Sequence, residues 1–585
     1  MAKSGLYALA ALDGASLDPR DLAILELELI EQQLAGFAAK VVDREEAGRA
    51  FSVAARPDGL TMLLGHLDEP GDLAAATNLP GGTPPAELAA AALARFGAEA
   101  PRRMIGEWSL LDWHAPSRTL TLLMSEATRD PIFFAFDGKR VAVSAEINRL
   151  TRLPWVGRDF DSAGLLLHWS SGPLRRYMTD ESVFKHVRRV TPGAREVFRL
   201  GDRKTLRLPA SSPADPWRGS FDEAMGEIEA LMRRIVGQHL SRHGAAASLL
   251  SGGLDSSLIA WLASSERGSS QPLSFLTSAA PDGSGIPDER QYSEIVAGHL
   301  GLPIKCLSPA PESSLYLPAD RMFAHTELPV VSPRHYLYNA LYEAAFGAGV
   351  ELLFDGAYGE LTITNPLPLL LSRTDPRRYV RAVRDWRRAR AGSHHAPAFP
   401  FHARLSPATA KALPSLLPFD WNAPFDPRPA MRGHEPWGIR DGAAKNAMTP
   451  TSSPEARLRH VIPFRDRRLI NLFATMPAAY LERDGLNRAP ARLMLAGRLP
   501  DSIRLRRDGG SFSPDFLVRA ERQAAETIDR IPDFRAVGAG KWLDLDWLER
   551  ELKQLSVPGT ATYARVHGAQ ATAGAASYFE WLSRQ

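Results

Sequence analysis

The 585-residue chain has very little cysteine and no long apolar run. Cys306 is the only cysteine, so an intramolecular disulfide is impossible and a thiolate zinc cluster is excluded, which fits a reducing compartment. No apolar stretch approaches the length of about 20 residues that crosses a bilayer. The N-terminal run "MAKSGLYALAALDG" is interrupted by Asp13 and makes a poor signal peptide. We therefore expect a cytoplasmic protein that is not inserted in a membrane.

The chain also lacks an excess of either charge. Its 70 Lys and Arg face 67 Asp and Glu, which leaves +3 at pH 7 and gives no general attraction to nucleic acid. An arginine stripe at 375–392 is better explained as a solvated helix face than as a nucleic-acid site, because the whole chain is nearly neutral. The histidines show no metal-binding spacing such as HExxH. The 44% hydrophobic content is that of a soluble globular protein, and the length predicts more than one domain.

Residues 1–205 have the pattern of a mixed, strand-rich domain. The runs "RTLTLLMS", "PIFFAF" and "KRVAVSAE" predict strands, and "DGK" between the last two predicts a hairpin turn. Helical periodicity covers 19–38 and 85–96. A stretch rich in proline and serine follows, so we expect a linker at 206–219.

From residue 220 onward, strands alternate with helices. The predicted helices are 221–240, from Ser256 to about Ser265, 289–300 and 335–347, and the predicted strands are 246–250, 273–279, 303–308 and 350–356. Such alternation predicts a doubly wound parallel sheet. Residues 366–450, rich in proline and arginine, give no clear pattern, and mainly helices are expected from 454 to the end.

The stretch "SLLSGGLDSSLIA" at 248–260 joins a predicted strand to a predicted helix. Its glycines permit a tight turn, and backbone amides, the helix N-terminus and three serine hydroxyls would converge where a phosphate group binds. At the carboxyl end of a parallel strand, this is where open α/β sheets bind ligands. The stretch is neither a Walker loop nor a GxGxxG motif. An ordinary helix-capping turn would explain "SGG" alone, but the strand, helix and embedded Asp255 favour phosphate binding.

This stretch resembles the pyrophosphate-binding loop of the asparagine synthetase-like ATP pyrophosphatases, which adenylate a carboxylate and pass the acyl group to an amine. Residues 273–303, with Asp288–Glu289, and the acidic loop in "GAGVELLFDGAYGEL" (347–361) resemble later parts of that family in the same order. The resemblance implies an adenine-nucleotide alpha-hydrolase-like domain at 220–585 that uses ATP and Mg²⁺. The ATP-binding residues that it implies are Leu250, Ser251, Gly252, Gly253, Leu254, Asp255, Ser256, Ser257, Thr277, Asp355 and Gly356. The chemistry of hard oxygen ligands suits Asp255 and Glu360 as the magnesium ligands.

The first 205 residues resemble the glutamine amidotransferase domain of the same family, an Ntn-hydrolase-like αββα sandwich. The resemblance lies in 106–150, with its "RDP" and "SAEI" segments, and "LLGHLDEP" (63–70) stands where that domain usually carries an Asn-Gly pair. The active domain needs an N-terminal cysteine as nucleophile. Here Ala2 follows Met1, so we expect a degenerate domain that cannot release ammonia from glutamine.

Without ammonia, the acyl acceptor is expected to be an amine on the substrate. Length, the missing cysteine and the "DG..GE" loop resemble the lasso peptide cyclases, which activate an Asp or Glu side chain of a peptide and join it to the N-terminal amine. The resemblance implies a precursor or core peptide as substrate, with a leader-peptide protease and a leader-recognition protein as partners, and 366–450 as a stretch where a peptide-specific surface could lie. An ammonia-dependent asparagine synthetase, a β-lactam-type small-ring former and a non-catalytic nucleotide-binding scaffold remain alternatives.

The resemblance names two further catalytic candidates, Arg488 and Arg507, beside Asp255 and Glu360. Arg488 and Arg492 lie where the family carries a lysine and an arginine on one helix. A later family lysine near Phe512 is absent, and Arg506 or Arg507 could replace it because a fixed guanidinium suits a leaving phosphate. The tyrosine of ring-closing members aligns with Ala357, one place before Tyr358, so the general base stays unassigned. In "EARLRHVIPFRDRRL" (455–469), Glu455 stands further from Pro463–Phe464 than in the family.

Overall fold

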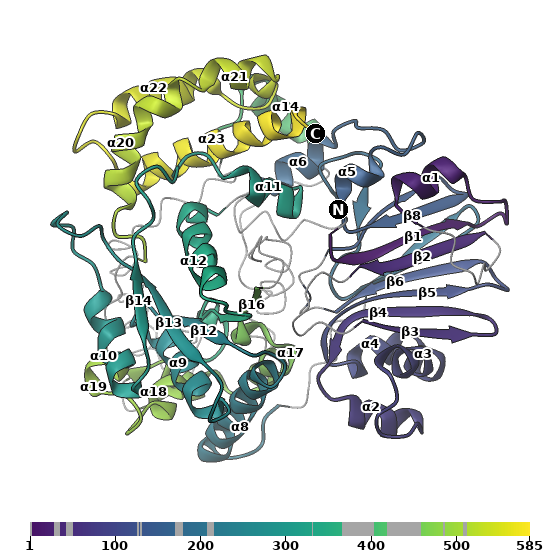
Figure 1. Cartoon of the computed structure of the whole chain (residues 1–585), viewed down its shortest axis with the longest axis horizontal. Coiled ribbons are helices and arrows are strands. Elements are labelled where there is room, and N and C mark those ends of the chain that lie inside the picture. The colour runs from purple at the N-terminus through teal and green to yellow at the C-terminus, as the bar shows by residue number, and fades with distance from the viewer. Residues whose placement is uncertain are drawn as a thin grey trace. The chain divides into compact units, whose positions relative to one another are not determined.

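A computed structural model of the chain (Figure 1) divides into two compact units. The structure describes residues 3–27, 36–42, 51–125, 128, 131–169, 180–207, 216–329, 332–364, 403–417, 458–483, 486–506 and 512–585. The described part of the first unit is built from residues 3–168 and 180–207, and the second unit contains residue 169 and the described chain from 216 onward.

The first unit contains two antiparallel sheets. One sheet has the order β2 (Phe37–Val42), β1 (Gly5–Ala11), β8 (Arg140–Ser144), β7 (Phe133–Phe136) and β9 (Arg188–Arg189). The other has the order β11 (Asp202–Arg207), β10 (Ala194–Arg199), β6 (Thr119–Met124), β5 (Gly106–His114), β4 (Gly59–Leu67) and β3 (Phe51–Arg56).

Alternating side chains on these strands form two separate cores. On β5, Leu111 and Trp113 face the core between the sheets, whereas Trp108 and Leu110 face a second core against helices. That second core is covered by α2 (Pro70–Thr77), α3 (Pro85–Phe96) and α4 (Ala100–Arg103). The short helix α5 (Ile147–Leu150) packs against β7 and β8, and the unit also contains α1 (Pro19–Ile24) and α6 (Ser162–His168). The helix, sheet, sheet, helix layering predicted for this region is therefore present.

The second unit is built around a parallel sheet. The order is β14 (Ile304–Leu307), β13 (Leu273–Ser278), β12 (Ala246–Leu249), β15 (Leu352–Phe354) and β16 (Arg459–Val461). In chain order this is 3-2-1-4-5, so the direction of winding reverses between β12 and β15. Such a reversal is the switch point at which open α/β sheets bind ligands.

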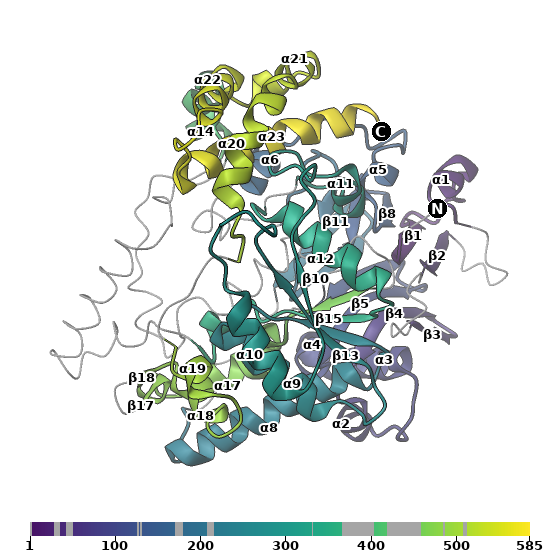
Figure 2. The ribbon, with the colours of Figure 1, turned by 60° about the vertical axis from the view of Figure 1, so that its left-hand side comes forward.

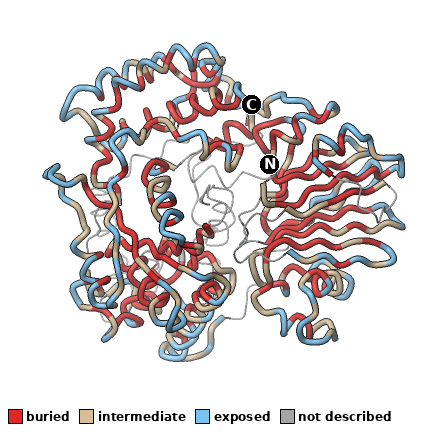
Figure 3. The backbone as a smooth tube through the Cα atoms, in the orientation of Figure 1, coloured by how far each residue is buried: buried red, intermediate tan, exposed pale blue. Residues whose placement is uncertain are grey.

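Helices cover both faces of this sheet. Figure 2 shows α9 (Leu254–Glu266) and α10 (Arg290–Leu300) on one side of the strands and α12 (His335–Gly347) on the other. The long helix α8 (Phe221–Leu240) packs on α9 and begins with a capping box between Ser220 and Glu223. Buried side chains of α8, α9, β13 and β15 form one continuous core, and Figure 3 shows these strands as buried.

The C-terminal part of the second unit is mainly helical. Its helices are α11 (Asp320–Thr326), α14 (Pro407–Leu416), α17 (Arg467–Thr475), α18 (Ala489–Met494), α19 (Asp501–Arg504), α20 (Phe516–Ile528), α21 (Ile531–Ala536), α22 (Leu545–Leu555) and α23 (Tyr563–Ser583). A small hairpin, β17 (Glu482–Arg483) with β18 (Leu486–Asn487), precedes α18. None of the helices in the described ranges is long and apolar enough to span a bilayer.

Most element predictions are confirmed, and two are corrected. Helix α3 has the predicted bounds, and the predicted hairpin joins β7 to β8. The helix predicted over 19–38 is wrong, because α1 ends at Ile24 and Phe37 begins β2, where its side chain packs in the core between the sheets. Helix α9 begins at Leu254, slightly before the predicted start. Most of the segment 366–450, with the arginine stripe, and most of the linker lie outside the described residues.

Candidate functional site

Two loops meet at the switch point of the parallel sheet. The phosphate loop (Leu250–Ser257) follows β12, and the acidic loop (Asp355–Glu360) follows the neighbouring strand β15. A side chain at Gly356 would begin 2.7 Å from the Cα atom of Ser256, so the two backbones are in direct contact. The strand order therefore brings together two motifs that are about a hundred residues apart in sequence.

Serine hydroxyls close the phosphate loop on itself. The Ser251 amide donates to Ser256 Oγ over 3.1 Å, and the two hydroxyl oxygens are 3.0 Å apart. The Gly253 amide donates to Ser251 Oγ at 3.3 Å, and Ser256 Oγ donates to the Gly253 carbonyl at 3.2 Å. These bonds fix the turn that leads into α9, whose first-turn amides have no intrahelical acceptor. A preformed helix N-terminus of this kind suits an anionic ligand.

Gly252 cannot be replaced without moving this loop. Its backbone is left-handed, with φ of +69°, and a Cβ atom would lie 2.4 Å from the Cβ of Tyr292 on α10. The two requirements together explain why the motif contains a glycine at this position.

Asp255, Glu360 and Arg488 form an electrostatically coupled group. Burial, together with the charge of Glu360, raises the pKa of Asp255 to about 6, against the opposing effects of the Thr364 hydroxyl and Arg488. Burial likewise raises the pKa of Glu360, and Arg488 again acts against the shift. Three of the four predicted catalytic residues are therefore close enough to influence one another. The fourth, Arg507, lies outside the described residues.

Several buried oxygen atoms around Asp255 have few or no hydrogen-bond partners among the described residues. Asp255 Oδ1 faces the Thr364 hydroxyl, and neither atom has another partner among the described residues. The hydroxyls of Ser257 and Thr362 are also buried, with no hydrogen bond to the described chain. The donor set of carboxylates and hydroxyls suits Mg²⁺, which commonly takes one or two carboxylates and completes its shell with phosphate oxygens and water. Within the described ranges, no cluster of three or more acidic, histidine or cysteine side chains could hold a metal alone.

Asp355 is held by a buried polar network on the other side of the acidic loop. Its Oδ2 atom lies 3.1 Å from His460 Nε2 on β16 and accepts from the Tyr338 hydroxyl at 3.2 Å, while Oδ1 accepts from the Ala357 amide at 2.9 Å. Burial alone would raise the pKa of Asp355, but the His460 contact and these other hydrogen bonds lower it below its ordinary value. His460 Nδ1 lies 3.0 Å from the Tyr342 hydroxyl. The Asp355 carboxylate therefore faces the protein interior, and any nucleotide contact here falls to the backbone of the loop.

The remaining residues of the acidic loop have strained or crowded backbones. Tyr358 is left-handed, with φ of +67°, and its ring lies 5.9 Å from the guanidinium carbon of the buried Arg465. Gly359 lies against Asp255, because a Cβ atom there would begin 2.5 Å from Asp255 Oδ1. The turn at Tyr358 thus delivers Glu360 to the site.

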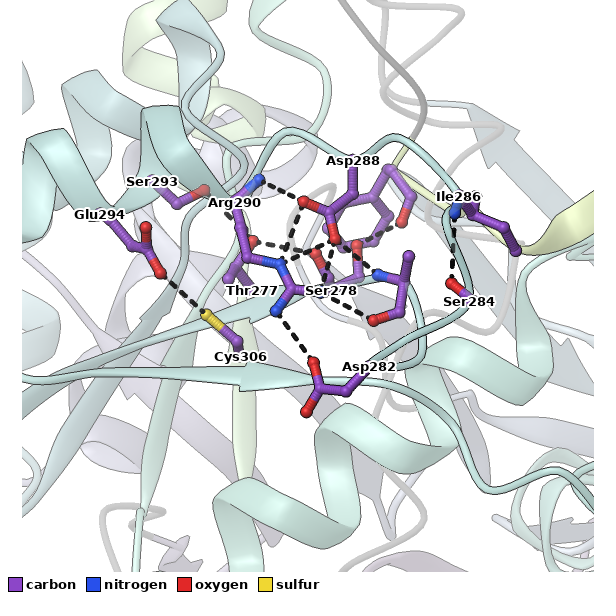
Figure 4. Close-up of polar contacts among 12 residues, drawn as sticks. Thr277, Ser278, Asp282, Ser284, Ile286, Asp288, Arg290, Ser293, Glu294 and Cys306 are labelled. Carbon is purple, nitrogen blue, oxygen red and sulfur yellow. Dashed lines mark hydrogen bonds and ion pairs between the residues drawn. The ribbon is translucent and has the colours of Figure 1, made fainter.

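A third loop, between β13 and α10, is tied down by an arginine (Figure 4). Arg290 Nε donates to Asp288 Oδ2 at 2.8 Å, and this carboxylate also accepts from the Ala280 amide at 2.8 Å. Burial opposes ionisation of Asp288, but the Arg290 contact and the backbone bonds lower its pKa. Asp288 is therefore engaged in fixing the loop.

The predicted adenine-slot residues lie on neighbouring strand ends. The Leu250 amide donates to the Leu276 carbonyl at 2.9 Å, and the Leu250 carbonyl accepts from Ser293 Oγ at 2.8 Å. Thr277 Oγ1 lies 3.2 Å from the same serine oxygen, as Figure 4 shows. Leu250 and Thr277 are both buried. Their contacts to a nucleotide remain a prediction.

Two arginines considered from the sequence have mainly structural contacts. Arg492 is buried and donates to the carbonyls of Asn487 and Arg506, at 2.8 and 3.1 Å. Arg506 pairs with Glu289, lies 3.7 Å from the centre of the Tyr292 ring, and donates to the Gly252 carbonyl at 3.4 Å. Arg506 therefore braces the phosphate loop.

Sequence reasoning did not find His460, Tyr338 or Thr364. His460 stands three residues before Pro463, inside the stretch 455–469 that was compared with the family and in which the spacing of Glu455 departs from it. That position was its only signal. Tyr338 and Thr364 carried no signal, because their roles depend on how α12 and the end of the acidic loop pack.

Comparison with known proteins supports the nature of the second unit. The family model described as asparagine synthase matches residues 227–395, which supports an asparagine synthetase-like, ATP-using carbon–nitrogen ligase domain. The search of curated proteins found no match. One similar solved structure is described as glutamine phosphoribosylpyrophosphate (PRPP) amidotransferase from B. subtilis complexed with ADP and GMP. It has 11% identity and a TM-score of 0.23, with 66% of this chain and 73% of that chain covered.

A second solved structure is described as the allosteric regulatory enzyme of purine biosynthesis. Its identity is 10% and its TM-score 0.23, over 54% of this chain and 77% of that chain. Neither TM-score is high enough to support a conclusion about this protein.

Proposed function

We propose that the protein is an ATP- and Mg²⁺-dependent ligase that adenylates an Asp or Glu side chain of a peptide and closes a macrolactam with the peptide's N-terminal amine. The observation that carries the proposal is the meeting of the phosphate loop and the acidic loop at the switch point, with Asp255, Glu360 and Arg488 coupled between them. The family match over 227–395 supports the ligase class, and the macrolactam is the proposal's own step.

The reaction balances in two steps. A carboxylate oxygen of the peptide attacks the α-phosphorus of ATP, and the bond to pyrophosphate breaks. The N-terminal amine then attacks the acyl carbon, AMP leaves, and the amine loses one proton. Holding both ends of one peptide makes the second step intramolecular, and such proximity contributes a large part of the rate.

The residues of the site have separate tasks in this scheme. The phosphate loop would hold the departing pyrophosphate through its amides, and Arg488 would balance negative charge as it develops. Asp255 and Glu360 would hold Mg²⁺, which neutralises the triphosphate. Arg507 is kept as a further candidate for contact with pyrophosphate.

An amine from the substrate suits the cysteine content. Cys306, the single cysteine of the sequence, lies on β14 of the second unit, and its Sγ is 3.9 Å from Glu294. The first unit thus has no thiol for releasing ammonia from glutamine, and we propose it as a degenerate amidotransferase-like domain. A leader-peptide protease and a leader-recognition protein would supply the peptide in the cytoplasm, with no nucleic acid involved.

Pyrophosphate exchange into ATP tests the proposal. Linear peptides with a free N-terminal amine and a side-chain carboxylate should drive exchange and give AMP and a product lighter by one water. The same peptides with an acetylated N-terminus should still drive exchange but give no ring. Asparagine from aspartate and ammonia would instead identify an ammonia-dependent synthetase. ATP binding with no exchange for any carboxylate would identify a scaffold, and either result would refute the macrolactam proposal.

A further inference from the structure

The Asp355 network joins three elements around one carboxylate. Asp355 lies at the end of β15, His460 on the adjacent strand β16, and Tyr338 and Tyr342 on α12. The imidazole of His460 is completely buried, and the two strands are paired through the Asp355 amide and the Val461 carbonyl at 2.8 Å. Such a network is costly unless its hydrogen bonds are made, so its geometry is well determined.

The contacts identify which imidazole nitrogen carries a proton. Asp355 is ionised at neutral pH because its pKa is lowered, so its Oδ2 can only accept. The Nε2 atom of His460 must therefore carry the proton that it shares with Asp355. Nδ1 then faces the Tyr342 hydroxyl, which can either donate or accept.

The same carboxylate shapes the acidic loop. While Oδ2 is held by His460, Oδ1 accepts from the Ala357 amide, which turns the chain immediately after β15. That turn places Gly356 against the backbone of Ser256 and brings Glu360 towards Asp255. If the Asp355 side chain were free to move, the backbones of the acidic loop and of the phosphate loop would consequently become more mobile.

We propose that His460 is a positioning residue of the ATP site, which holds the acidic loop in its nucleotide-binding form through Nε2–H and Asp355. It touches neither the nucleotide nor the metal, and it acts through the loop alone. The inference rests on the proposed function in that the second unit binds MgATP.

Two substitutions separate the two sides of the imidazole. His460→Gln can place an amide N–H near the position of Nε2 and so keeps the donor to Asp355. His460→Asn places its amide near Nδ1 and leaves Asp355 without that donor. Tyr342→Phe removes the hydroxyl that faces Nδ1 and keeps the Nε2–H donor to Asp355. The three changes are small, and comparison of their unfolding midpoints with wild type shows whether each variant is folded.

Affinity for a Mg²⁺ complex of ATP with an α,β-methylene bridge is the first measurement. We expect His460→Asn to weaken binding about tenfold or more, as loss of a supporting contact does at metal sites. His460→Gln and Tyr342→Phe should stay within about fivefold, the effect of a single neutral hydrogen bond. Equal losses in all three variants, or normal binding by His460→Asn, would overturn the proposal.

Amide hydrogen exchange of the peptide that covers 352–361 is the second measurement and needs no nucleotide. His460→Asn should speed exchange in the acidic loop, and the other two variants should not. If His460→Asn does not fold, Asp355→Asn replaces it, since its amide opposes Nε2–H with a donor and should also speed exchange. Wild-type protein that fails to bind MgATP would refute the proposed function, while the exchange comparison would still decide the role of His460.

Discussion

Replacing Asp255 by asparagine should stabilise the protein in the absence of metal and abolish its activity. The carboxylate is largely buried, and burial together with the charge of Glu360 raises its pKa to about 6. The unfolded chain ionises such a carboxyl near 3.8. The folded protein therefore binds a proton at this carboxylate more readily than the unfolded chain does, and at neutral pH the charge on Asp255 lowers the stability of the fold.

The size and pH dependence of the gain follow from this shift. A rise from 3.8 to about 6 corresponds to about 3 kcal/mol of lost stability once both states are ionised. When the pH lies below the pKa of the unfolded chain, the raised pKa lowers stability by nothing. The loss of stability grows as the pH rises between the two pKa values, and it is complete when the pH exceeds the pKa of the folded state. The advantage of Asp255→Asn should accordingly be about half as large at pH 5 as at pH 8.

Urea unfolding in EDTA at several pH values measures this difference. The variant should unfold at higher urea than wild type, with the gap widening from pH 5 to pH 8. Saturating Mg²⁺ and ATP should stabilise the wild type and not the variant, because the variant lacks one of the two carboxylates proposed to bind Mg²⁺. A variant that is less stable than wild type at pH 8, or a gap that does not change with pH, would refute the assignment of a buried, uncompensated charge to Asp255.

Three further substitutions test other parts of the structure. Gly356→Ala should weaken MgATP binding by at least tenfold, since its methyl group would meet the backbone of the phosphate loop. The control Gly298→Ala, on the exposed side of α10, should instead raise the free energy of unfolding in urea by about 0.5–1 kcal/mol. Burial lowers the pKa of His335 to about 4. The unfolding free energy of wild type should therefore fall by up to about 3 kcal/mol relative to that of His335→Gln as the pH falls from 6.5 to 4. Equal pH profiles of stability in the two proteins would contradict this. Arg506→Gln should raise the Kd for MgATP by loosening the phosphate loop, whereas Arg498→Gln, which removes another arginine stacked on an aromatic ring, should leave the Kd unchanged.

Local sequence patterns were sufficient for the four strands β12 to β15 and for the helices α8, α9, α10 and α12 of the second unit. The phosphate-loop glycines mark the end of β12 because Gly252 needs a left-handed backbone, and the apolar periodicity of 221–240 gives the bounds of α8. The same reasoning failed at 19–38, where helical periodicity continued through residues that pair with β1 as a strand. Pairing with a distant strand is decided by tertiary packing, which overrides local propensity.

The convergence of the candidate site was only partly predictable. Asp255 and Glu360 could be named because their motifs resemble those of the family, and each motif follows a strand of the same predicted sheet. That β15 lies directly beside β12, and β16 beside β15, depends on strand order, which no local pattern contains. The contact between His460 and Asp355 depends on that order, because β16 places His460 next to Asp355.

The direction of the pKa shifts divides the acidic residues at the strand ends into two groups. The pKa values of Asp288 and Asp355 are lowered, because Arg290 and His460 outweigh the effect of burial on these carboxylates. The pKa values of Asp255 and Glu360 are raised, because Arg488 compensates their burial only in part. The first pair is already neutralised within the protein and serves to hold loops in place. The protein stabilises the charges of the second pair only in part, and a bound cation would offset the remaining loss of stability. Under the proposed function, Asp255 and Glu360 would hold the Mg²⁺ of MgATP, and the stability lost by burying the Asp255 charge would favour binding of the metal complex over free ATP.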